Sequence, residues 1–315
     1  MEINLPIAQM EQGMRVEGFY LLKDASVKKA SNGRLYLSAS VMDCSGAITL
    51  MMWDYSGTID EADVGKVVKV RGDVSMYKNS NQITASRLRL ATDQDEVDLS
   101  RLVPVAPIDA DMRYQEVLSL VNTLEDDDYR AVAQEMLRRH AQALRTIPAA
   151  KSVHHSFLSG LLMHTSNMLK TADFFSALYP EVVDRSLLLT GTLLHDLAKE
   201  REFAFSGIGL ATAYTAEGQL LGHLVMGAQE IAEVCRTLGT PEQKSMLLQH
   251  LILSHHGNPE YGAAVVPMCA EAELLSLIDR VDSRMEIYAE ILPTLQPDSF
   301  SGKIYALDKK IYRHE

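Results

Sequence analysis

Histidine and aspartate side chains recur along the C-terminal half of the chain in a pattern suited to binding metal ions. Most of them lie within or beside apolar stretches, where a neutral imidazole or a carboxylate needs a polar partner. A divalent cation satisfies several such groups at once. The candidate ligands are His164, His195, Asp196, His223, His255, His256 and Asp279. The sequence therefore predicts a metal site assembled from distant segments.

Helices are expected to carry these ligands. The pair His195-Asp196 ends an apolar run, and the pair His255-His256 ends another that Gly257 then stops. Apolar residues recur with a helical period through the rest of this region. The predicted helices cover residues 129–146, 157–178, 184–198, 222–238, 241–254 and 270–292.

The N-terminal segment, in contrast, has the pattern of β-strands. In residues 34–41, Leu35, Leu37, Ala39 and Val41 alternate with polar side chains, as in a half-buried strand. Further strands are predicted at 14–23, 47–53, 66–74 and 82–90. Five short strands joined by turns favour a small barrel of the OB type. A small sandwich is the alternative.

The predicted architecture is an α+β multidomain chain. Residues 1–90 form an OB-like β-barrel, and residues 91–110, which are acidic and contain two prolines, form a linker. Residues 111–315 form an all-α domain.

Composition restricts where the protein works and what it binds. The N-terminus lacks the features of a signal peptide, and no apolar run approaches the ~20 residues that cross a bilayer. The three cysteines form no CxxC pattern, so we expect a cytoplasmic protein without a membrane partner. The net charge is −12, yet residues 1–90 hold 11 Lys+Arg against 10 Asp+Glu. Any nucleic-acid contact is therefore expected to be local and in the N-terminal domain.

The order of the ligands resembles the HD superfamily of metal-dependent phosphohydrolases. That family has a His, then a His-Asp pair, then a distant Asp, which here are His164, His195, Asp196 and Asp279. Histidines between the pair and the last Asp are typical of members with two metals, and His223, His255 and His256 stand there. The resemblance covers about residues 150–290.

A narrower resemblance is to the YhaM-type 3′→5′ exoribonucleases. It rests on residues 154–164, 214–223 and 250–257 together with an OB-like N-terminal domain. Ser159 and Met163 depart from the Gly and Glu that such proteins often carry. His154 and His155 are interpreted as a polar helix start.

This resemblance implies hydrolysis of phosphodiesters with one or two divalent ions. Such ions activate water for attack on phosphorus and neutralise charge on the phosphate. Asp196 has two carboxylate oxygens with which to bridge two ions. Mn²⁺ is the ion expected first, with Fe²⁺, Co²⁺ and Mg²⁺ as alternatives. Lys199 is expected to place its ammonium against the phosphate.

Other ionisable residues receive less specific interpretations. Asp282 is interpreted as a cap or as a partner of Arg280 or Arg284. His140 and His250 are interpreted as surface groups or as groups behind the ligands.

Aromatic and basic residues of the β domain suit the binding of single strands. Rings stack on bases while cations hold the backbone. The candidates are Arg34, Tyr36, Trp53, Lys69 and Arg71. The alternative is that Tyr and Trp simply suit strands.

Three functions agree with these patterns. The first is a cytoplasmic 3′→5′ exoribonuclease that acts on single-stranded RNA, or on single-stranded DNA, and releases nucleoside 5′-monophosphates. The second is a hydrolase of small nucleotides from the same superfamily, whose β domain serves assembly. The third is a nucleic-acid-binding module without catalysis. Assembly of several copies into a homo-oligomer would increase the apparent affinity for nucleic acid through avidity.

Overall fold

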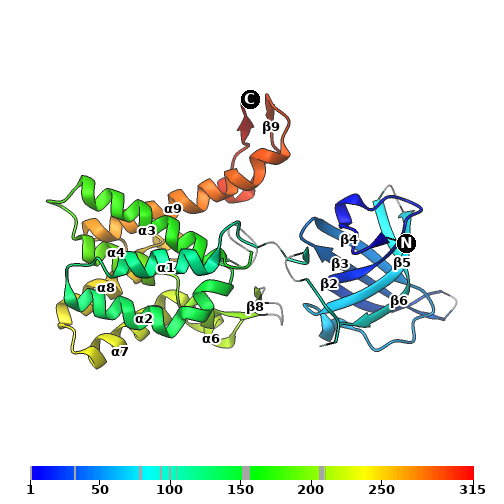
Figure 1. Ribbon diagram of the computed structural model, residues 1–315, viewed down its shortest axis with the longest axis horizontal. Helices are drawn as coiled ribbons and strands as arrows, with labels where there is room; N and C mark the ends of the chain where they lie inside the picture. Colours follow the sequence, from blue (N-terminus) through cyan, green and yellow to red (C-terminus); the bar gives the residue numbers. More distant parts are fainter. Residues whose placement is uncertain are drawn as a thin grey trace. The chain divides into compact units, whose positions relative to one another are not determined.

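The chain forms two compact units. One reaches up to Val105, and the other comprises Ala106–Ala204 and Ala211–Glu315 (Figure 1). No described helix is long and apolar enough to cross a membrane. This computed structural model describes residues 2–31, 33–77, 80–92, 94–98, 101–103, 105–150, 157–205, 209 and 211–315.

Five strands of the first unit close into a barrel of the OB type. Their order is β2–β3–β4–β6–β5, and β5 pairs with β2 to complete the ring. Pairing is antiparallel except between β4 and β6, which are parallel. The closed ring excludes a sandwich, and a short strand β1 lies beside β2. The strands are β1 Glu2–Ile3, β2 Arg15–Lys29, β3 Leu35–Asp43, β4 Gly46–Met52, β5 Val67–Tyr77 and β6 Ser80–Leu90.

The alternation predicted for β3 is present with one exception. Leu37, Ala39 and Val41 are buried in the barrel core, as expected for one face of a strand. Leu35 shares their parity but is 48% exposed, because it begins the strand where the barrel interior ends.

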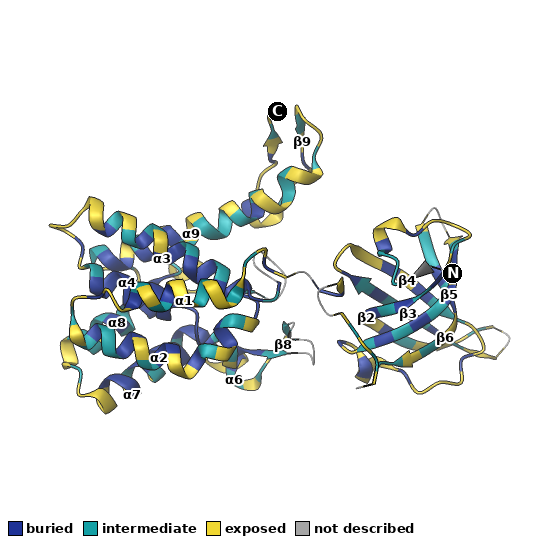
Figure 2. Cartoon of the chain, viewed as in Figure 1, coloured by how far each residue is buried: buried dark blue, intermediate teal, exposed yellow. Residues whose placement is uncertain are grey.

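The second unit is helical, apart from short strand pairs. Figure 2 shows its outer helices with mixed buried and exposed residues, as amphipathic helices require. The helices are α1 Ala110–Val121, α2 Asp127–Thr146, α3 Gly160–Leu178, α4 Arg185–Leu194, α5 Lys199–Glu202, α6 Ala216–Leu220, α7 Gly222–Leu238, α8 Glu242–Ser254 and α9 Ala270–Ile291. The short pairs are β7 Phe203–Phe205 with β8 Ala211–Tyr214, and β9 Ser299–Phe300 with β10 Tyr312–Arg313.

Helix α4 is the central element of this unit. Every residue from Ser186 to Leu194 is buried, and the helix packs against α2, α3, α8 and α9. Gly191 allows the closest approach, because a Cβ there would lie 2.2 Å from Leu251 of α8. The absent side chain lets the C-terminal ends of α4 and α8 meet.

Two predicted helix boundaries were wrong by three or more residues, and both errors lie beside ligands. The helix predicted at 184–198 ends at Leu194, so that His195 and Asp196 occupy a turn before α5. The helix predicted at 157–178 begins at Gly160. Helices α1, α5 and α6 and the two strand pairs had no prediction.

The start of α3 explains a departure from the YhaM-type pattern. Ser159 has φ +61°, a left-handed conformation that favours glycine. Its Oγ donates to the backbone oxygen of Arg145 at 2.7 Å, a contact that glycine cannot make. The serine thus offsets part of the backbone strain.

Candidate metal centre

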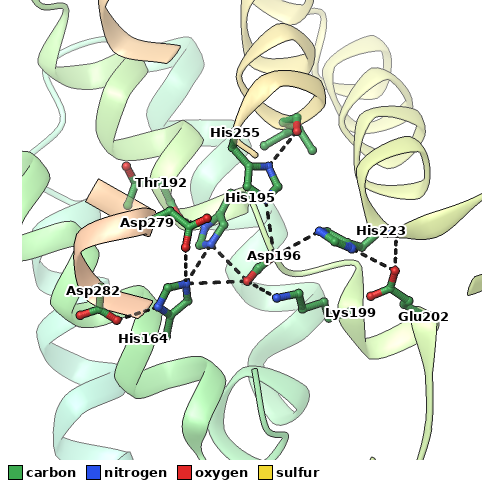
Figure 3. Close-up of polar contacts among 11 residues, drawn as sticks. His164, Thr192, His195, Asp196, Lys199, Glu202, His223, His255, Asp279 and Asp282 are labelled. Atoms are coloured by element: carbon green, nitrogen blue, oxygen red, sulfur yellow. Dashed lines mark hydrogen bonds and ion pairs between the residues drawn. The ribbon is translucent and has the colours of Figure 1, made fainter. Parts of the chain in front are cut away.

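The seven predicted ligands come together in the helical unit, around one end of α4. They come from α3, the turn after α4, the start of α7, the turn after α8, and α9. Figure 3 labels all of them except His256. Six of them line a cavity of about 950 Å³, and His195 lies directly behind Asp196. The lining ligands are His164, Asp196, His223, His255, His256 and Asp279.

Two of the histidines are held by the ends of their own helices. His195 Nδ1 donates to the Thr192 carbonyl at 2.8 Å, and His255 Nδ1 donates to the Ile252 carbonyl at 2.8 Å. Each bond satisfies a carbonyl at a helix C-terminus that lacks its helical partner. Because a carbonyl only accepts, both rings carry their proton on Nδ1 and present a lone pair at Nε2.

Two other histidines are held by carboxylates. His164 Nδ1 lies 2.7 Å from Asp282 Oδ2, and His223 Nδ1 lies 3.0 Å from Glu202 Oε1. The sequence interpretation of Asp282 as a cap or arginine partner missed its contact with His164. Glu202 had no prediction at all. Such partners fix the tautomer and orientation of a metal-binding imidazole.

The four Nε2 atoms converge on Asp196. Its Oδ2 lies 3.2 Å from His195 Nε2 and 3.8 Å from His164 Nε2. Its Oδ1 lies 3.5 Å from His223 Nε2 and 3.8 Å from His255 Nε2. The Nδ1 contacts of these histidines all point away from Asp196, so that the Nε2 atoms are the ones directed at its carboxylate. The His164 and His195 rings also contact each other there, with 3.3 Å between their Nε2 atoms.

Unsatisfied atoms at this point fit a metal. Asp196 Oδ1 and His223 Nε2 are buried and have no hydrogen-bond partner among the described residues. Unsatisfied buried polar atoms are costly in an apolar interior. A coordinated cation would satisfy both atoms, so the residues present fit a divalent ion.

The ligands fall into two groups that share Asp196. Within each group, ligand atoms lie within 4.8 Å of one another: His164, His195 and Asp196 form one, and His223, His255 and His256 form the other. Asp279 belongs to the first group, since its Oδ1 is 3.3 Å from His164 Nε2. One oxygen of Asp196 faces each group, the arrangement that a bridge between two ions needs. The bridging role remains a prediction.

Electrostatics differ between the two groups. Burial opposes a charged His164 ring, but Asp279 and Asp282 outweigh it and raise the pKa of His164 to about 9. Burial, reinforced by the neighbouring His195 and His256, holds the pKa of His255 well below its usual range. The first group therefore has the more negative field, and the second offers neutral imidazole.

Lys199 lies at the junction of the two groups. Its Nζ is 2.6 Å from Asp196 Oδ2, and its side chain lines the cavity. Burial opposes the ammonium, but Asp196 raises the pKa of Lys199, so it stays charged. The predicted contact with a substrate phosphate stays a prediction.

Asp282→Ala is expected to weaken metal binding about 10–100-fold, because His164 would lose the carboxylate that orients its ring. The measurement is the Mn²⁺ concentration that gives half-maximal activity of the stripped enzyme. Glu290→Ala, also on α9, is the control and should leave that concentration unchanged. Equal behaviour of the two variants would exclude an orienting role for Asp282.

Two further described histidines, His140 and His250, lie apart from the ligand groups. His140 is buried, not on the surface, and lies between Glu200 at 2.7 Å and Glu230 at 3.1 Å. His250 Nε2 accepts from the backbone NH of Met268. The predictions for His154 and His155 lie outside the described residues.

In the barrel, three of the five predicted nucleic-acid residues form one group. The rings of Tyr36 and Trp53 lie 5.0 Å apart, and Trp53 is 54% exposed. Arg34 pairs with Asp54 at 3.1 Å beside them. The exposed ring of Trp53, which lies against the half-buried Tyr36, is suited to stacking on a base.

Lys69 and Arg71 lie in a separate basic groove of about 440 Å³ between β5 and β6. They stand directly opposite Arg89 and Arg87, which the sequence reasoning missed. Glu17 lies 3.6–3.7 Å from the two predicted cations, and Asp95 pairs with Arg89. Met52, the residue before Trp53, also lines this groove. Like charges in opposed strand positions repel, so an anion would stabilise the groove.

Comparison with known proteins identifies the class. Residues 161–284 match the HD domain family. The helical unit therefore contains an HD domain, the domain of metal-dependent phosphohydrolases, and its ligand groups lie within the matched segment.

Solved structures that resemble this chain include OB domains. The second OB-fold domain of replication protein A from Methanococcus maripaludis is 11% identical over 31% of this chain and 100% of its own, with a TM-score of 0.22. The OB domain of Ta0387 from Thermoplasma acidophilum is 10% identical over 31% of this chain and 93% of its own, with a TM-score of 0.25. At these scores the barrel assignment rests on its own strand order.

Proposed function

We propose that the protein is a metal-dependent 3′→5′ exoribonuclease that shortens single-stranded RNA and releases nucleoside 5′-monophosphates. The observation that carries the proposal is the pairing, on one chain, of an HD phosphohydrolase centre with a barrel that has a pair of contacting rings, one of them exposed, and a basic groove. The direction and the products are those of the YhaM-type enzymes that the helical motifs resemble.

The cavity supports a nucleic-acid substrate. Its volume of about 950 Å³ is at the upper end for ligand sites, and its walls carry both cations and aromatic rings. When bound, divalent ions supply activated water and neutralise phosphate charge. The chain itself holds the ligand atoms in place, and Lys199 keeps an ammonium at the cavity wall.

Mn²⁺ is the proposed metal, with Fe²⁺, Co²⁺ and Mg²⁺ as the alternatives to test. Five of the seven candidate ligands are imidazoles, and Mg²⁺ prefers oxygen ligands and retained water.

A strand labelled at its 5′ end tests the activity. With Mn²⁺, the protein should shorten a single-stranded RNA oligomer one nucleotide at a time while the label is retained, and nucleoside 5′-monophosphates should accumulate. A DNA oligomer of the same sequence tests the preference for RNA. Hydrolysis of free nucleotides with the strands left intact would instead support the small-nucleotide hydrolase.

Trp53→Ala is expected to weaken binding of single-stranded RNA about 5–100-fold, because one stacked base contributes roughly 1–3 kcal/mol. Fluorescence anisotropy of a labelled RNA oligomer measures the affinity. Trp53→Phe keeps an aromatic ring and should retain most of the RNA affinity. Phe300→Ala, which removes a ring from the exposed Phe300–Tyr312 pair of the helical unit, is the control. Unchanged affinity in Trp53→Ala would remove the ring pair from the binding surface.

A further inference from the structure

Helix α9 contributes more to the catalytic cavity than the ligand Asp279. Viewed down the helix axis, Asp282 lies on one side of Asp279 and contacts His164. Arg280 and Arg284 lie on the other side of Asp279. The two arginines are one turn apart and both line the cavity. The complete α9 lining is Glu273, Ser276, Leu277, Asp279, Arg280, Ser283 and Arg284.

In the described chain, the two arginines have no carboxylate partner. Within the part of the chain that the structure describes, neither guanidinium makes an ion pair or a hydrogen bond. Most of the described arginines are paired, as Arg185 is with Asp173 and Arg139 with Glu135. Like charges one turn apart also destabilise a helix. An anion in the cavity would relieve both effects.

The anion that suits this pair is a phosphate. A guanidinium presents two parallel N–H groups that match two phosphate oxygens. Lys199 is less available, since its Nζ already lies 2.6 Å from Asp196. Among the described lining residues, the two arginines are therefore the cations without a partner.

The ligand groups and the arginines occupy different parts of the cavity. The two ligand groups around Asp196 would hold the divalent ions, so the scissile phosphate is expected beside these groups. The cavity continues past α9 to Ala306, Leu307 and Asp308 of the C-terminal segment, so it holds more than one phosphate and its sugar.

We propose that Arg280 and Arg284 bind the phosphate one nucleotide 5′ of the scissile phosphate. This second phosphate site would make the centre prefer a strand over a molecule with a single phosphodiester. The inference rests on the proposed exonuclease function and names the part of the substrate that these residues recognise.

Two uridine dinucleotides that differ by one phosphate test the site. UpU has only the scissile phosphate, and pUpU adds the 5′-phosphate that the arginines would bind. The full-length protein with Mn²⁺ should show a kcat/KM for pUpU about 10–100-fold above that for UpU, the range for a charge-assisted hydrogen bond. In the double variant Arg280→Ala/Arg284→Ala this ratio should fall to about one, with UpU hydrolysis within about threefold of the parent.

Arg236→Ala is the matched control. Arg236 is an exposed arginine near the end of α7, makes no ion pair among the described residues, and is absent from the cavity lining. It should leave the ratio unchanged. If the double variant loses UpU and pUpU hydrolysis equally, the arginines support the fold or the metal ligands, and the inference is overturned.

Binding without metal separates this inference from the exonuclease proposal. In EDTA, the parent should bind pUpU about tenfold or more tightly than UpU, and the double variant should bind both equally. If the parent hydrolyses no dinucleotide, the exonuclease proposal fails. The two dissociation constants in EDTA still show whether the arginines bind the second phosphate. An unchanged ratio of the two dissociation constants would overturn the inference.

Discussion

Asp196→Asn is expected to lower turnover of an RNA strand at least about 1000-fold, because the shared carboxylate would lose the charge and one of the two oxygens that face the ligand groups. The fold should persist. The new amide would donate to an imidazole lone pair such as that of His223 Nε2, which lies 3.5 Å from Asp196 Oδ1. The measurements are steady-state turnover, metal content and far-ultraviolet circular dichroism.

Two controls make this result specific. Thr190→Val removes a buried hydroxyl that has no hydrogen-bond partner in the described chain, on helix α4 directly before Asp196, and should leave turnover unchanged. RNA affinity of Asp196→Asn should match the parent if the barrel binds the strand. A variant with normal turnover would show that Asp196 is not a shared ligand, and loss of RNA affinity would place binding in the helical unit.

The sequence predicted the metal centre because its residue types are unusual where they stand. Imidazoles and carboxylates at the ends of apolar helices, such as Asp196 and His255, are costly without partners, and the apolar pattern locates the helices. The structure brings these groups together as expected. That they bind metal stays a prediction until an ion is measured.

The groups behind the ligands could not be predicted in the same way. Asp282 contacts His164 across 118 positions of sequence, and Glu202 contacts His223 across 21. Nothing local distinguishes either carboxylate from a surface acid. Asp282 was accordingly assigned to its sequence neighbours Arg280 and Arg284, which a helical period also permits.

In the barrel, pattern alone found the strands but not the groove. Alternation located β2 to β6 within a few residues at most ends, although β2 runs on to Lys29. Arg87 and Arg89 were missed because their pairing with Arg71 and Lys69 depends on strand register and on the bulge between Arg71 and Gly72. The left-handed backbone conformation of Ser159 could not be predicted either, because serine rarely adopts a positive φ.

Removing the metal is expected to abolish RNA hydrolysis and to destabilise the helical unit alone. The imidazoles around Asp196 come together only in the folded unit, so Mn²⁺ binds the folded centre and not the unfolded chain. At about 1000 times its dissociation constant the ion adds about 4 kcal/mol, a rise in Tm on the order of 10 °C for a domain of this size.

The chain provides separate probes for its two units. Trp53 is the single tryptophan and lies in the barrel, so its fluorescence follows barrel unfolding, whereas circular dichroism at helical wavelengths follows α1 to α9. Adding Mn²⁺ to the EDTA-treated protein should raise the helical transition and leave the Trp53 transition in place, because the barrel has its own core. In Asp196→Asn, Mn²⁺ should raise the Tm of the helical transition much less than in the parent. Equal shifts in both probes, or none in the parent, would show that the ligand groups are not a metal site that stabilises the helical unit.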